Sequence, residues 1–258
     1  MILLSPGGDT VHRSTQSETS VAVATVEGVF ILEREADGSW KVAHQALAGC
    51  FVAALTRAPG GALYAATHGV GMARSDDNGR TWRWINEGIS QFDLWAVRAG
   101  TLGGRDVVLT GSMPAHLFIS HDGGATFEDL KIDPDPGECD LHRILIHPKR
   151  PGRILIANGL MGLMRSNDGG TSWSKDGPLP EMNYPDAYVM HPDDPDLLFV
   201  SAAVGWPPHW YKLRRARGKI ARSRDGGKTW ERLLGGLPDG QPTAADTNSR
   251  SGSSGCIT

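Results

Sequence analysis

Cysteine is scarce in this 258-residue sequence, which contains only Cys50, Cys139 and Cys256 and no Cys-x-x-Cys pair. Three widely spaced cysteines provide neither a disulfide framework nor the ligand spacing of a zinc site. No apolar run reaches the roughly 20 residues that a membrane-spanning helix needs. The first ten residues have neither the basic segment nor the apolar stretch of a secretory signal. We therefore expect a cytoplasmic protein that does not interact with a membrane.

An excess of charge of one sign is also missing. The net charge is −3 and 21% of the residues are charged, so no overall electrostatic field would draw the chain to nucleic acid. The hydrophobic fraction of 40% is typical of a soluble globular domain. In contrast, turn-forming residues are abundant, with 33 glycines and 16 prolines beside eight tryptophans. This composition favours many short strands over helices.

A box with the pattern Ser-x-Asp-x-Gly-x-x-aromatic occurs four times, at residues 75–82, 120–127, 166–173 and 223–230. The serines that open the boxes are 45, 46 and 57 residues apart. Before each box, two apolar stretches are separated by a glycine-rich turn, and a short stretch after the box begins at the aromatic residue. Four short strands repeated at this period are typical of a propeller blade.

The chemistry of the box is that of a pinned turn rather than an active site. Its aspartate can accept hydrogen bonds from the backbone N–H groups of its own turn, and its glycine can adopt a positive φ at low cost. Its aromatic residue can pack between sheets, where burial contributes about 2–3 kcal/mol. We assign structural roles to Ser75, Asp77, Gly79, Trp82, Ser120, Asp122, Gly124, Phe127, Ser166, Asp168, Gly170, Trp173, Ser223, Asp225, Gly227 and Trp230.

The four boxes resemble the Asp-box, or BNR, repeat of sialidases, other glycoside hydrolases, sortilin-type receptors and photosystem-assembly propellers. The resemblance covers residues 17–235 and implies a fold rather than one function, because these families do unrelated things on one scaffold. We expect an all-β protein, a β-propeller of four-stranded antiparallel blades with five visible units. Residues 20–42 would be a decayed first unit that keeps Asp37, Gly38 and Trp40.

The ends of the repeat leave the closure of the ring open. Residues 1–237 should form one propeller domain, and the Ser/Gly/Thr-rich residues 238–258 read as a disordered or altered tail. A strand around residues 9–14 could complete the last sheet and close a five-bladed ring. Alternatively, the chain is truncated from a six- or seven-bladed ring. The abrupt end of the pattern slightly favours truncation, which would leave an open molecule prone to self-association.

Propeller topology predicts where a ligand would bind. The turns between the second and third strands, and the links between units, lie on the face opposite the boxes. In this architecture that face is usually the one that binds ligands. Polar candidates in these segments are His68, Asp93, His116, Glu138, Asp140, His142, Asn158, Asn183, Tyr184 and Asp186.

The last unit contains a longer loop, because its box follows the previous one at 57 rather than 46 residues. Its aromatic residues suit stacking on a sugar or a base, and its arginines suit a carboxylate or a phosphate. The alternative is an insertion that caps a neighbouring blade and leaves its cations in solvent. The candidates in this loop are Trp206, His209, Trp210, Tyr211, Arg214, Arg215 and Arg217.

Three functions remain open. We favour a non-catalytic scaffold that binds a protein or a carbohydrate, without a cofactor. The second is a glycoside hydrolase, which needs only a paired acid and base, and its candidates are Asp93, Glu138, Asp140 and Asp186. A sialidase is not expected, since the early Phe-Arg-Ile-Pro stretch and three arginines spread between units are missing. The third is a metal-supported site among the histidines, although no local spacing demands a metal.

Overall fold

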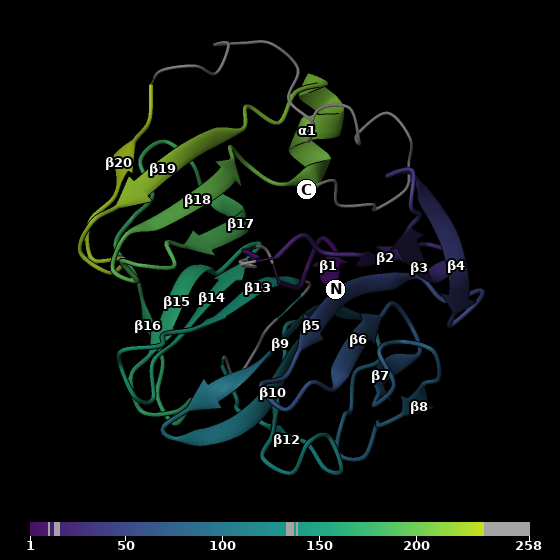
Figure 1. The fold of residues 1–258 in the computed structure, drawn as a ribbon. Coiled ribbons are helices and arrows are strands. Elements are labelled where there is room, and N and C mark those ends of the chain that lie inside the picture. The colour runs from purple at the N-terminus through teal and green to yellow at the C-terminus, as the bar shows by residue number, and fades with distance from the viewer. Residues whose placement is uncertain (10, 13–15, 133–136, 138, 235–258) are drawn as a thin grey trace.

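The structure, a computed structural model, describes residues 1–9, 11–12, 16–132, 137 and 139–234. Five four-stranded sheets are arranged around a common centre, and the short helix α1 lies beside the fifth sheet (Figure 1). The predicted all-β propeller with five visible units is therefore confirmed. Glu138 and the predicted tail at 238–258 lie outside the described residues.

Each sheet runs outward from an inner strand. The first sheet contains β1 (Ile2–Leu4), β2 (Ser20–Thr25), β3 (Gly28–Arg34) and β4 (Trp40–Ala46). The second contains β5 (Val52–Arg57), β6 (Leu63–Thr67), β7 (Gly71–Ser75) and β8 (Arg83–Trp84). The third contains β9 (Leu94–Leu102), β10 (Arg105–Ser112), β11 (Leu117–Ser120) and β12 (Glu128–Asp129). The fourth contains β13 (Leu141–Ile146), β14 (Ile154–Asn158), β15 (Gly162–Ser166) and β16 (Ser174–Lys175). The fifth contains β17 (Tyr184–Met190), β18 (Leu198–Ala203), β19 (Lys219–Ser223) and β20 (Glu231–Arg232), with α1 (Pro207–Leu213) between β18 and β19.

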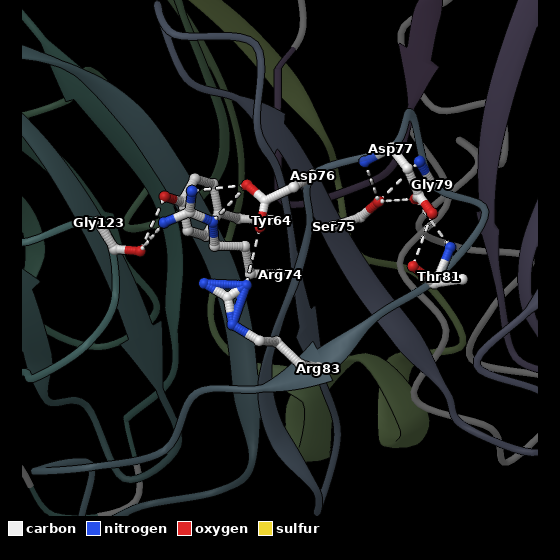
Figure 2. A network of polar contacts seen from close by, with 9 residues as sticks. All are labelled: Tyr64, Arg74, Ser75, Asp76, Asp77, Gly79, Thr81, Arg83 and Gly123. Atoms are coloured by element: carbon white, nitrogen blue, oxygen red, sulfur yellow. Dashed lines mark hydrogen bonds and ion pairs between the residues drawn. The ribbon is translucent and has the colours of Figure 1, made fainter.

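The four Asp-boxes pin the turns between the third and fourth strands of their sheets. Figure 2 shows the first box. In the first box, the Ser75 hydroxyl donates to Asp77 at 2.8 Å and accepts the N–H of Gly79 at 2.8 Å, while Asp77 accepts the N–H of Thr81 at 2.8 Å. The other boxes repeat these three bonds. Hydrogen bonds from Thr81 lower the pKa of Asp77 to about 2. The box carboxylates are thus engaged in their own turns.

Strand β1 departs from the antiparallel pattern, because it runs parallel to β2. From its end the chain passes between the inner strands of the second and third sheets, where the N–H of Gly7 donates to Ala53 O at 3.1 Å and Gly7 O accepts the N–H of Val97 at 3.3 Å. The expectation that residues 9–14 complete the last sheet is wrong for the described residues, since Asp9 instead bonds to Leu55 and Arg98.

Gly7 is required by this close passage. A Cβ atom at Gly7 would lie 1.9 Å from the carbonyl oxygen of Trp95. We expect Gly7→Ala to lower the free energy of unfolding by about 1–3 kcal/mol, since the backbone must shift to relieve the overlap. Urea denaturation followed by tryptophan fluorescence measures this loss. Gly60→Ala is the matched control, because no atom lies within 4 Å of a Cβ there. Equal stability of the two variants would contradict the prediction.

Apolar cores lie between neighbouring sheets. Ile31 of the first sheet packs with Leu63 of the second in one buried cluster, and three comparable clusters join the second sheet to the third, the third to the fourth and the fourth to the fifth. The three middle sheets are therefore covered on both faces. Among the described residues, no such cluster joins the fifth sheet to the first.

Candidate functional site

Six aromatic rings form a continuous row on the face opposite the boxes. The centroids of successive rings are 4.4, 4.6, 6.0, 5.3 and 5.1 Å apart. The row extends from the second sheet to α1. Each of the four sheets after the first contributes at least one ring, carried by its inner strand, by the link before that strand or by a turn. This aromatic row consists of Phe51, His68, Trp95, His142, Tyr184 and Trp210.

The cavity beside the row is small. Its volume is about 20 Å³, which is room for a water molecule rather than for a sugar ring. Pro6 and Gly7 line it together with row residues, so the N-terminal segment occupies the centre that an open propeller channel would offer. A ligand too large for the centre could reach only the half-buried rings of the row, Phe51, His68, Trp95 and Trp210, because His142 and Tyr184 are buried.

An ion pair is buried at the middle of the row. His142 lies on β13, and its Nε2 is 2.9 Å from Asp140 Oδ2, while its Nδ1 is 2.7 Å from Pro185 O. The hydroxyl of Tyr184 donates to Asp140 at 3.0 Å. Both ring nitrogens thus face acceptors, which favours the doubly protonated imidazolium. Asp140 and Tyr184 are 44 positions apart along the chain, and the ring of sheets brings them together.

The protonation states of this pair follow from two opposed effects. Burial lowers the pKa of His142, but the charge and the hydrogen bond of Asp140, together with the charge of Asp186, outweigh it and raise the pKa to about 9. Burial alone would raise the pKa of Asp140, but the charge of His142 and the hydrogen bonds of His142 and Tyr184 hold it below its ordinary value. Both groups are therefore charged at neutral pH.

A second histidine–carboxylate pair lies at the other end of the cavity. His68, in the turn between β6 and β7, bonds through Nδ1 to Asp93, whose side chain is 43% exposed. The N–H of Gly69 donates to Phe92 O at 2.9 Å, which fastens this turn to the link before β9. Asp186 also lines the cavity. Two carboxylates, Asp93 and Asp186, therefore flank the aromatic row.

Three other predicted residues lie outside this arrangement. His116 bonds to Asp129 at 2.8 Å, on the outermost strand β12 of its sheet. Asn158 accepts the N–H of Met161 at 3.3 Å within its own turn, and Asn183 accepts the N–H of Gly205 at 2.8 Å. The structure does not bring these three side chains into the aromatic row.

The long loop of the fifth sheet contributes one residue to the row. Trp210 packs edge-on against Tyr184 and donates from Nε1 to Val204 O at 2.9 Å. None of the residues of α1 is buried. Trp206 and His209 contact each other with ring centroids 5.8 Å apart. The remaining loop candidates are Tyr211, Arg214 and Arg217, which are exposed, and Arg215, which is half-buried.

Sequence reasoning missed two residues of the row. Phe51 directly precedes β5, and Trp95 is the second residue of β9, so both read as ordinary strand aromatics. The available signal was their position, since each follows a link on the predicted ligand face. In the part of the chain that the structure describes, no three potential ligands of the His, Cys, Asp or Glu type come together as a metal site. No described helix is long and apolar enough to span a membrane.

Comparison with known proteins supports the propeller fold and its boxes. Residues 221–232, around the fourth box, match the BNR/Asp-box repeat. The chain is an Asp-box β-propeller. A probable oligoxyloglucan-reducing end-specific xyloglucanase of Neosartorya fischeri is 24% identical over 192 residues, which are 62% of this chain and 22% of that protein. The Asp-box propeller thus spans about a fifth of the length of this curated relative.

Solved structures with a similar fold belong to proteins of different kinds. An ancestral GH74 enzyme superposes with a TM-score of 0.69 at 17% identity, over 91% of this chain and 32% of its own. The protein YCF48 bound to D1 peptide superposes with a TM-score of 0.52 at 14% identity, over 81% of this chain and 62% of its own. At these identities the likeness shows the propeller fold.

Proposed function

We propose that this Asp-box propeller is a non-catalytic binding module that holds a carbohydrate chain across the aromatic row. The observation that carries the proposal is the row itself, a series of adjacent rings beside a cavity of only about 20 Å³. Aromatic faces stack on the apolar faces of sugars, and flanking carboxylates accept hydrogen bonds from hydroxyl groups. Asp93 and Asp186, which flank the row, would take this second role.

The protonation chemistry supports binding without hydrolysis. A two-carboxylate glycosidase needs one carboxylic acid that stays protonated until it donates to the leaving oxygen. Asp140 has a lowered pKa, and its oxygens are bonded to His142 and Tyr184. Asp93 is paired with His68. Asp140 is therefore held as the charged partner of His142 rather than as a proton donor.

A glycoside hydrolase is the second candidate, and the similarity to the xyloglucanase of Neosartorya fischeri favours it. Asp93 and Asp186 would then be the pair that flanks the glycosidic bond, because both lie beside the row. On this alternative the exposed Asp93 would act as base on a water molecule and Asp186 as acid.

Calorimetric titration with xyloglucan oligosaccharides tests the binding function. We expect saturable binding that Trp210→Ala weakens about fivefold, since loss of a stacking ring removes roughly 1 kcal/mol. Tyr211→Ala is the control, because Tyr211 lies on the same helix but is exposed and outside the row. Thermal unfolding of each variant checks that the fold is intact.

Two results would contradict the proposal in different ways. Absence of binding by neutral and acidic oligosaccharides alike would show that the row does not recognise carbohydrate. Release of shorter products, detected by mass spectrometry after incubation, would show hydrolysis. In that case Asp186→Asn should abolish product formation if the second candidate is correct.

A further inference from the structure

Exposed large apolar side chains in the turns of the propeller lie on the face of the aromatic row. Val26 lies between β2 and β3, Val70 between β6 and β7, and Leu160 between β14 and β15. In the part of the chain that the structure describes, the turns that contain the boxes have no exposed large apolar side chain, and neither do the turns that join the first and second strands of the second to fifth sheets. Single exposed apolar residues are ordinary, but their restriction to one face is not expected of a surface that meets only water.

The loop between β18 and β19 concentrates such residues. Trp206, Tyr211 and Leu213 are 38%, 53% and 60% exposed, and no residue of α1 is buried. The helix lies beside the fifth sheet (Figure 1). Leu160 lies in the corresponding turn of the fourth sheet, which is the neighbour of the fifth. We call Leu160, Trp206, Tyr211 and Leu213 the apolar edge.

The same loop contains four cations within six positions. Among the described residues, none of the four belongs to an ion pair. In contrast, Lys219 and Arg232 of the same sheet both bond to Glu181, at 2.6 and 2.7 Å. Their charges are therefore available to a partner outside the chain. These loop cations are Lys212, Arg214, Arg215 and Arg217.

The backbone of the loop holds these cations in a defined arrangement. The N–H groups of Arg214 and Arg215 both donate to Trp210 O, the second at 3.1 Å. Ala216 is fully buried in the cluster that contains Tyr184. Arg214 and Arg217 each have a φ of 52°, in the left-handed region that residues other than glycine adopt at a cost. The segment after α1 is thus fastened to the propeller while its charged side chains stay at the surface.

We propose that the apolar edge and the loop cations form a docking site for a membrane surface that contains anionic lipid. The apolar side chains enter the boundary between head groups and acyl chains, and the cations meet the lipid phosphates. Asp186 lines the central cavity, so its charge keeps the contact at the α1 edge instead of over the row. Trp210 is not part of the contact, and the proposal does not rest on carbohydrate binding. The expectation of no membrane contact was based on net charge and on the length of apolar runs, neither of which records how side chains are distributed over the surface.

A lipid surface fits this edge better than nucleic acid or a protein. One basic loop on a chain of net charge −3 does not make a nucleic-acid-binding face, and aliphatic side chains such as Leu213 have no partner on a phosphate backbone. The core of a protein interface is a continuous apolar patch depleted of lysine. Here apolar and cationic residues alternate instead, as Tyr211, Lys212, Leu213 and Arg214. Alternation of this kind suits the zone where head groups and acyl chains meet.

Co-sedimentation with phospholipid vesicles tests the proposal. We expect the chain to bind vesicles of phosphatidylcholine mixed with phosphatidylserine, more tightly as the phosphatidylserine content rises, and to be released by salt. Vesicles of phosphatidylcholine alone should bind it at least about tenfold more weakly. Replacing two cations together, Arg214→Gln with Arg217→Gln, should weaken binding at least about tenfold, because each cation near such a surface contributes a factor of about five.

Two further variants separate the apolar contribution from the charge. Leu213→Ser should weaken binding about tenfold without changing its dependence on salt, since it removes apolar contact alone. The control is Lys175→Gln with Lys228→Gln, which removes the same net charge from the exposed outer strand β16 and from the last box turn. This control should bind as the wild type does. Circular dichroism checks the fold of each variant, and Lys212→Gln with Arg215→Gln replaces the arginine pair if that pair does not fold.

Three results would overturn the proposal. The first is absence of binding at every phosphatidylserine content. The second is a loss in the control pair as large as that in the arginine pair, which would mean that only the net charge matters. The third is self-association of the chain that Leu213→Ser abolishes while no vesicle is bound, which would assign the apolar edge to a protein contact.

Discussion

Replacement of Asp140 by alanine is expected to lower the free energy of unfolding by about 3–5 kcal/mol, because it breaks a buried ion pair from one side. Asp140 holds His142 Nε2 at 2.9 Å and accepts the hydroxyl of Tyr184 at 3.0 Å. Without the carboxylate, the imidazole must lose its proton inside the protein, and the tyrosine hydroxyl loses its acceptor. Chemical denaturation at neutral pH measures the loss.

The matched control for this variant is Asp76→Ala. Asp76 also bonds to two cationic side chains, Arg74 at 2.6 Å and Arg83 at 2.8 Å (Figure 2), but its side chain is 52% exposed. Exposed ion pairs contribute less than about 1 kcal/mol, since water and salt screen them. A loss in Asp140→Ala no larger than that in Asp76→Ala would show that burial does not set the strength of the pair.

The fold could be predicted from the sequence because the information about it is local and repeated. Ser120, Asp122 and Gly124 determine their own turn within five residues, and the same arrangement recurs at each box. Strand β1 could not be predicted in this way. It has three residues, and its parallel pairing with β2 depends on the return of the chain through the centre. In the sequence, the Gly7–Gly8 pair indicates this close passage of the chain, since only glycine fits at these two positions.

The candidate site was predictable as a face but not as a set of contacts. Topology alone assigned Asp140, His142 and Tyr184 to one side of the propeller. Their hydrogen bonds depend on how far each sheet is rotated about the centre, and no local sequence pattern records that rotation. His116 shows the converse, because its loop was assigned to the predicted side and yet its side chain points to Asp129 on the outer strand.

The charged state of His142 predicts a specific dependence of stability on pH. The pKa of His142 is about 9 in the folded protein, against 6.5 for an ordinary histidine, so the folded state binds the proton more tightly. The resulting stabilisation, about 3 kcal/mol, is fully present below pH 6.5 and is lost as the pH rises to about 9. In this window the pair-forming Asp140 stays ionised, because its pKa is lowered.

Comparison of the wild type with His142→Gln isolates this contribution. Glutamine keeps a hydrogen-bonding side chain at β13 but cannot be charged, so its stability should vary less between pH 6.5 and 9. The difference between the two unfolding free energies, measured by urea denaturation at intervals of pH, should therefore shrink as the pH rises. His147 does not interfere, because burial lowers its pKa and places its titration below this window. Parallel curves across the window would mean that His142 is neutral in the folded protein, and that the row is held by hydrogen bonds rather than by an ion pair.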